Sequence, residues 1–205
     1  MSHLHTILLG DPADAALDWA ALELAQIEFA QLDPQPFVQQ IDQIADEVDR
    51  RTSGSDASRF VSDFNRYLFE ELGFRGNRED YYNPTNSFLN VVLSQRTGIP
   101  ITLAVLYIAV AQRLQRPVYG VGLPGHFVTT YFEGDFKVWI DVFHGGRLLT
   151  PEDCARLSRQ TSGYDLSDDL RLLAPVDNRY ILLRMLNNLR GIYLQRKAAR
   201  KWIAV

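Results

Sequence analysis

The chain has 205 residues, of which 46% are hydrophobic and 22% are charged, a composition typical of a globular protein with one sizeable core. Its net charge of −4 argues against a nucleic-acid-binding protein, because phosphate recognition needs a basic face. The single cysteine excludes an internal disulfide, and the sequence has no apolar run of about 20 residues that could span a membrane. The N-terminus has no basic segment of the kind that begins a signal peptide, so we expect a cytoplasmic protein.

The first half of the chain has the periodicity of amphipathic helices. Apolar residues recur at three- and four-residue spacing in segments that predict helices over 12–30, 38–51, 60–73 and 86–96. A fifth helix, over 103–114, is preceded by Gly98-Ile99-Pro100-Ile101-Thr102 and has no charge on any face through Ala111. Such a helix belongs in the middle of a domain, and proline suits a first helical turn. We therefore expect a buried central helix with Thr102 near its amino end.

The second half changes to β-strand patterns. Glu133-Gly134-Asp135 predicts a hairpin turn, and Gly145-Gly146 predicts a second turn. Strands are expected at 116–121, 127–132, 136–141 and 147–149. Thr150-Pro151, with Asp153 three residues on, predicts a capped helix start, and one long amphipathic helix, or two, is expected over 177–200. Helices, then an antiparallel sheet, then helices again predict an α+β fold. We divide it into an N-terminal helical region (1–56), a core (57–165) and C-terminal helices (166–205).

Four segments around the central helix resemble the transglutaminase-like superfamily, and more closely its bacterial SirB-type branch. They are Asn86–Leu89 (NSFL), Arg96–Tyr107 (RTGIPITLAVLY), Val118–Phe127 (VYGVGLPGHF) and Ile140–Gly146 (IDVFHGG). The resemblance implies a catalytic cysteine at a helix start, then a histidine and an aspartate on neighbouring strands. Carried over by position, these places are held by Thr102, His126 and Asp141. The resemblance also implies a cleft lined by Asn83, Asn86, Ser87, Gly125 and His144.

The nucleophile is where this sequence departs from the superfamily. A helix amino terminus and an imidazolium can tune a thiol to a thiolate near neutral pH, but an alcohol needs a general base in near contact. Threonine is also stiff about χ1, which limits how its hydroxyl can be aimed. In the other interpretation, Thr102 is a first-turn residue whose hydroxyl satisfies a backbone N–H. The sequence therefore indicates the fold more strongly than a reaction, and on balance not an enzyme.

The histidine and the aspartate are expected to form a hydrogen bond. The hairpin turn is centred near 133–134, which makes His126 and Asp141 cross-strand neighbours. His144 could add a second imidazole, but a histidine pair without a cysteine or glutamate at ligand spacing is weak support for zinc, so we expect no metal and no cofactor. Cys154, the only thiol, lies away from the nucleophile position, and a free cysteine usually acts as a small buried hydrophobe.

Three functional hypotheses follow. The first is a non-catalytic binding or regulatory module whose cleft takes an amide, a carboxylate or a peptide of a protein partner. The second is a peptidase, amidase or acyl transferase with a Thr102-His126-Asp141 triad, which requires a Thr102–His126 hydrogen bond. The third is a scaffold that binds partners through an exposed apolar stripe of the C-terminal helix (Ile181, Leu189, Ile192, Tyr193). In the SirB-type family tetratricopeptide-like repeats follow, and 186–194 looks like the first helix of one; a single repeat must pack on the domain, or the sequence is truncated.

Overall fold

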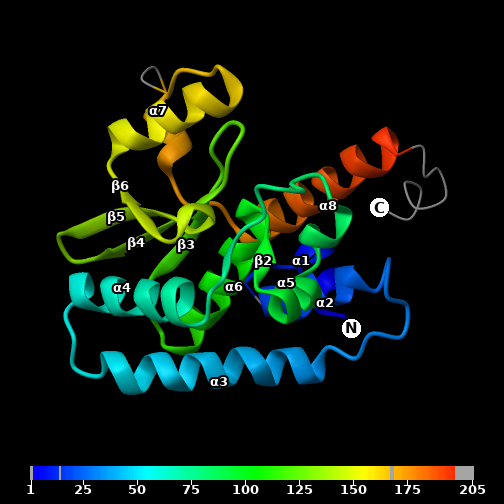
Figure 1. The fold of residues 1–205 in the computed structure, drawn as a ribbon, viewed down its shortest axis with the longest axis horizontal. Helices are drawn as coiled ribbons and strands as arrows, with labels where there is room; N and C mark the ends of the chain where they lie inside the picture. Colours follow the sequence, from blue (N-terminus) through cyan, green and yellow to red (C-terminus); the bar gives the residue numbers. More distant parts are fainter. Residues whose placement is uncertain (1, 14, 167–168, 197–205) are drawn as a thin grey trace.

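The central helix predicted from the sequence is α6 (Pro100–Arg113), and every residue from Pro100 to Ala111 is buried. The computed structural model describes residues 2–13, 15–166 and 169–196, and α6 runs through the middle of them (Figure 1). Long helices lie on one side of α6 and a four-stranded sheet lies against another. The result is the α+β fold that the order of sequence patterns predicts.

Helices and two short strands precede α6. They are α1 (His3–Leu9), α2 (Leu17–Ala25), α3 (Gln35–Thr52), α4 (Ala57–Asn65), the π-helical η1 (Arg66–Glu71), β1 (Arg75–Gly76), the 3-10 helix η2 (Pro84–Ser87), α5 (Leu89–Gln95) and β2 (Thr97–Gly98). The strands β1 and β2 form a parallel pair, and α2, α3 and α5 all pack on α6. Arg113 at the end of α6 connects α6 to two of these helices, because it forms ion pairs with the buried Asp18 of α2 and with Asp42 of α3.

Two of these helices differ from the sequence-based prediction. The helix α1 was not expected; it forms because the Glu23 carboxylate of α2 accepts hydrogen bonds from the backbone N–H groups of His3 and Leu4, a long-range contact invisible to local periodicity. The helix predicted over 12–30 is the shorter α2. The helix predicted from Asn86 begins at Leu89, because Phe88 is extended and its buried ring packs edge-on against Phe29.

The sheet contains β3 (Val118–Val121), β4 (Val128–Glu133), β5 (Phe136–Asp141) and β6 (Arg147–Leu149), in that order and antiparallel throughout. The hairpin turn is Gly134-Asp135, with Gly134 at φ +58°, the sign that a tight hairpin turn requires there. Thr129 pairs with Ile140, so the turn centre lies later than predicted. Asp141 therefore falls opposite Val128, and His126 is not its direct cross-strand neighbour.

The remaining elements are η3 (Val142–His144), α7 (Pro151–Ser162), the 3-10 helix η5 (Leu170–Leu173) and α8 (Asn178–Gln195). The predicted cap of α7 is confirmed, since Thr150 Oγ1 accepts from Asp153 N–H and the Asp153 carboxylate accepts from Thr150 N–H. In Figure 1, α7 lies across the sheet from α3 and α4. It covers a second, smaller apolar cluster that includes Trp139, Leu149 and Cys154.

The helix α8 packs on the body of the protein. Its apolar stripe is 8% exposed or less at each position: Ile181, Leu189, Ile192 and Tyr193. One apolar core includes side chains from Ile7 to Tyr193, and so draws on all three predicted regions; the boundaries at 56 and 165 stay a prediction. Among the described helices, none combines the length and the apolar character needed to cross a bilayer.

Candidate functional site

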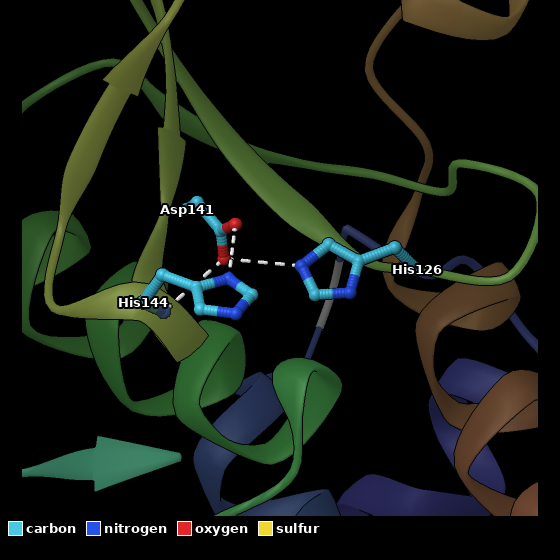
Figure 2. A group of neighbouring side chains, drawn as sticks. All are labelled: His126, Asp141 and His144. Atoms are coloured by element: carbon cyan, nitrogen blue, oxygen red, sulfur yellow. Dashed lines mark hydrogen bonds and ion pairs between the residues drawn. The ribbon is translucent and has the colours of Figure 1, made fainter. Parts of the chain in front are cut away.

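The centre of the candidate site is a carboxylate held between two imidazole rings. Asp141 ends β5, His126 lies just before β4, and His144 ends η3. Asp141 Oδ1 is 3.0 Å from His126 Nε2, and Asp141 Oδ2 is 2.6 Å from His144 Nδ1 (Figure 2). The predicted hydrogen bond between His126 and Asp141 is therefore present, and the second imidazole joins the same carboxylate.

Local backbone geometry brings His126 to Asp141 despite the shifted register. Gly125 has φ +72°, and a side chain there would also collide with Thr161 Oγ1, so a glycine is required at this position. Arg184 of α8 then fixes the turn by donating to the carbonyl oxygens of Leu123 (2.8 Å) and His126 (2.7 Å). The helix α8 thus positions the histidine through its backbone.

Asp141 is an ionised hydrogen-bond acceptor. Burial alone would raise its pKa, but the hydrogen bonds from His126 and then His144 outweigh burial, and the pKa lies below its ordinary value of 3.8. Because an ionised carboxylate can only accept, both imidazole nitrogens facing it carry protons. His126 Nδ1 and His144 Nε2 are the ring nitrogens that do not face the carboxylate, and neither has a hydrogen-bond partner among the described residues.

The segment after Asp141 is built to aim His144. The Asp141 side chain also accepts from His144 N–H at 3.3 Å and so caps η3. The ring of Phe143 lies against both imidazoles, with centroids 6.1 Å from His126 and 5.1 Å from His144. Gly76 of β1 allows this packing, because a Cβ there would lie 2.4 Å from the Phe143 ring.

Thr102 is fully buried in the first turn of α6, and its hydroxyl is occupied. Thr102 Oγ1 accepts from Ile99 N–H (3.2 Å) and lies within donating distance of the carbonyl oxygens of Asn86 (2.8 Å) and Ile99 (3.1 Å). This is the first-turn capping role predicted as the structural interpretation. The hydrogen bond to His126 that a catalytic triad requires is absent from the described contacts.

Two of the predicted cleft residues that precede α5, Asn83 and Asn86, stabilise the loop before it through hydrogen bonds to its backbone. Asn83 Oδ1 accepts from Thr85 N–H and caps η2, and the Asn86 side-chain amide donates to the carbonyl oxygens of Asp80 and Tyr81. Tyr81 in turn contacts Phe143 at 5.9 Å between ring centroids. Ser87 is buried and its hydroxyl has no partner. The loop therefore links two parts of the site: Asn86 contacts Thr102 at the start of α6, and Tyr81 packs on Phe143 beside the histidine–aspartate cluster.

Cys154 lies in the small apolar cluster under α7. The thiol is buried, and burial raises its pKa to about 12. A thiol of this kind is almost wholly protonated at neutral pH and is a poor nucleophile. Cys154 is therefore the small buried hydrophobe that the sequence predicts.

The structure contains one hollow that borders the cluster and a smaller one that borders Tyr81. One, of about 530 Å³, is bordered by Asp141, His144 and three arginines: Arg78, Arg147 and Arg156. The other, of about 180 Å³, lies between Tyr81, Tyr82, Ile99 and α8. His126, Asp141 and His144 present possible metal-ligand atoms within 4.8 Å of one another. The adjoining arginines make the electrostatic surroundings unfavourable to a cation.

Sequence reasoning missed the residues that reach the site from far away in the chain. Arg184 falls within the long amphipathic helix predicted over 177–200, and its place beside the buried Ile181 and Met185 is a usable signal of a specific partner. Arg78 and Arg156 carry no local signal at all, because only the fold brings them beside His144.

Fold and site together define an α+β protein with a buried histidine–aspartate pair, and with a threonine that caps the first turn of the central helix. A family profile described as the transglutaminase-like superfamily matches residues 35–187. The match covers more than half of the chain, and the chain belongs to this superfamily.

Similar proteins of known sequence fall into two groups. A UPF0162 protein of Xylella fastidiosa (strain Temecula1) is 44% identical over 132 residues, which cover 63% of this chain and 47% of the relative. The UPF0162 protein of Pseudomonas aeruginosa is 29% identical over 197 residues, covering 89% of this chain and 70% of the relative. F-box only protein 21 of Mus musculus is 35% identical over 141 residues, covering 64% of this chain and 21% of the relative.

The chain therefore matches about half the length of the Xylella relative and about a fifth of the mouse protein. The comparison with solved structures gives no match.

Proposed function

We propose that the chain is a non-catalytic, transglutaminase-like binding or regulatory module. The observation that carries the proposal is the state of Thr102, which the resemblance places at the nucleophile position: its hydroxyl is buried and bonded to the backbone of η2 and of Ile99, the residue before α6. Attack by an alcohol requires transfer of its proton to a base as the new bond forms. The hydroxyl is directed at carbonyl oxygens, which cannot take that proton.

Other groups near the site do not supply the missing chemistry. Cys154 is buried with a pKa of about 12, so a thiolate is scarce at neutral pH. His126 is hydrogen-bonded to Asp141 through Nε2, and no nucleophilic side chain is hydrogen-bonded to its ring within the described structure. An oriented base without a nucleophile is suited to binding, because the same imidazole can accept from or donate to a ligand.

The finer assignment of this domain rests on the sequence resemblance. We propose a SirB-type protein with a protein or peptide partner, and a C-terminal helix that begins a tetratricopeptide-like region. The resemblance over 186–194 and the long α8 support this assignment. The packing of α8 supports a helix that docks on the domain and weakens the scaffold hypothesis, because the apolar stripe required for partner binding is buried.

A turnover assay tests the proposal. The full chain is incubated with amine donors and with glutamine- or ester-bearing substrates, and product is measured beside a His126→Ala variant. We expect no turnover above that of the variant. The competing hypothesis, an acyl transferase or amidase using Thr102, His126 and Asp141, predicts turnover that His126→Ala abolishes. That result would overturn the proposed function.

A further inference from the structure

The larger hollow beside the histidine–aspartate cluster has the size of a small-molecule site. Its volume of about 530 Å³ falls in the range of about 300–1,000 Å³ that is usual for ligand pockets. Asp141 and His144 form part of its wall, so a ligand in this hollow would lie directly against the second imidazole. Leu149 and Leu157 give the wall an apolar portion as well.

Three arginines converge on this hollow from separate parts of the fold. Arg78 follows β1, Arg147 begins β6 and Arg156 lies on α7. Arg78 has no hydrogen bond or ion pair within the described residues, and Arg147 has a single distant contact, 3.9 Å from Asp153. Guanidinium groups without a protein partner still have their donors available for a ligand.

The two carboxylates in the wall do not use up these donors. Asp153 accepts from the backbone N–H of Thr150 and from Arg156 Nη1 at 3.1 Å. Asp141 accepts from both imidazoles. Three guanidinium groups against two carboxylates leave a formal charge of 3 − 2 = +1 on the wall. The wall is therefore complementary to an anion.

We infer that this larger hollow binds a small ligand that carries an oxyanion, either a phosphate or a carboxylate, joined to an apolar group. Arg78 and Arg147 would hold the oxyanion, since planar guanidinium forks match both groups. His144 Nε2 would contact the ligand, and Leu149 with Leu157 would take its apolar part. This inference names the ligand class of the proposed binding module and rests on that proposed function.

Calorimetric titration of the full chain tests the inference. The probes are phenyl phosphate, benzoate and inorganic phosphate, which separate a phosphate from a carboxylate ligand and show the contribution of the apolar group. We expect phenyl phosphate or benzoate to bind with a Kd below about 1 mM. Arg78→Gln and Arg147→Gln should each weaken binding by about tenfold, because each removes a charge-assisted hydrogen bond.

Arg59→Gln is the matched control, because Arg59 is an exposed arginine of α4 outside the larger hollow. This substitution should leave the Kd unchanged. Arg78 and Arg147 are themselves exposed, so the thermal unfolding midpoint of each variant should match the wild type. The inference would be overturned if none of the three anions bound at about 10 mM, or if Arg78→Gln and Arg147→Gln both left binding intact. So would binding of Zn²⁺ that His144→Gln abolishes, without binding of any anion. The turnover assay is separate, so either idea can fail alone.

Discussion

Removing the Thr102 hydroxyl should destabilise the fold. In Thr102→Val the shape of the side chain is nearly conserved, but the Asn86 carbonyl and the Ile99 N–H each lose a buried partner. A buried polar group left unpaired costs about 1–3 kcal/mol, so two such groups, partly offset by the added methyl, should lower the free energy of unfolding by about 2–3 kcal/mol. At about 3 °C per kcal/mol for a chain of this size, the unfolding midpoint should fall by about 6–9 °C.

The assay is thermal and urea unfolding followed by circular dichroism, with two companion variants. Thr102→Ser preserves the hydroxyl and should recover at least half of the loss. Thr97→Val removes a threonine hydroxyl that is bonded to a backbone carbonyl at the surface, and it should change stability by less than about 0.5 kcal/mol. A Thr102→Val protein as stable as the wild type would refute the capping role.

Three further predictions concern other parts of the molecule. Arg113→Met should lower the free energy of unfolding in urea by about 3 kcal/mol, because it leaves Asp18 buried and unpaired. Adding Asp18→Asn should recover part of this loss, and simple additivity of the two changes would contradict the prediction. Because the pKa of Asp141 is lowered in the folded state, its contribution to stability is complete above the ordinary pKa of 3.8 and is lost as the pH falls through the lower pKa of the folded state. The wild type should lose this part of its stability below pH 3.8 and Asp141→Asn should not, whereas parallel curves would count against the hydrogen bonds of the Asp141 carboxylate. Cys154 should react slowly with a thiol reagent at about pH 8 until the protein is unfolded, since its pKa is about 12, and rapid native-state labelling would contradict its burial.

The elements predicted best are those whose causes are local. The helix α6 is readable because an uncharged run follows a proline start, and α7 is readable because Thr150 and Asp153 cap each other. The β4–β5 hairpin follows from alternation around Gly134, although a small error in the turn centre moved His126 relative to Asp141. Register depends on the detailed turn geometry, which the pattern specifies only approximately.

The parts that could not be predicted depend on contacts between distant segments. The helix α1 depends on Glu23, and the turn before His126 depends on Arg184 of α8. The candidate site was found from the family pattern, yet the pattern did not show that His144 shares the carboxylate of Asp141. Its three-residue spacing from Asp141 was a usable signal, because one turn of 3-10 helix brings such a pair together.

The most direct test of the account is whether Thr102 ever becomes acylated. The full chain would be exposed to an excess of an activated ester or a glutamine-mimetic acylating probe, and the intact mass followed by peptide mapping would locate any adduct. The account predicts no adduct at Thr102, in the wild type or in His126→Ala. A stoichiometric acyl adduct at Thr102 that His126→Ala prevents would contradict it.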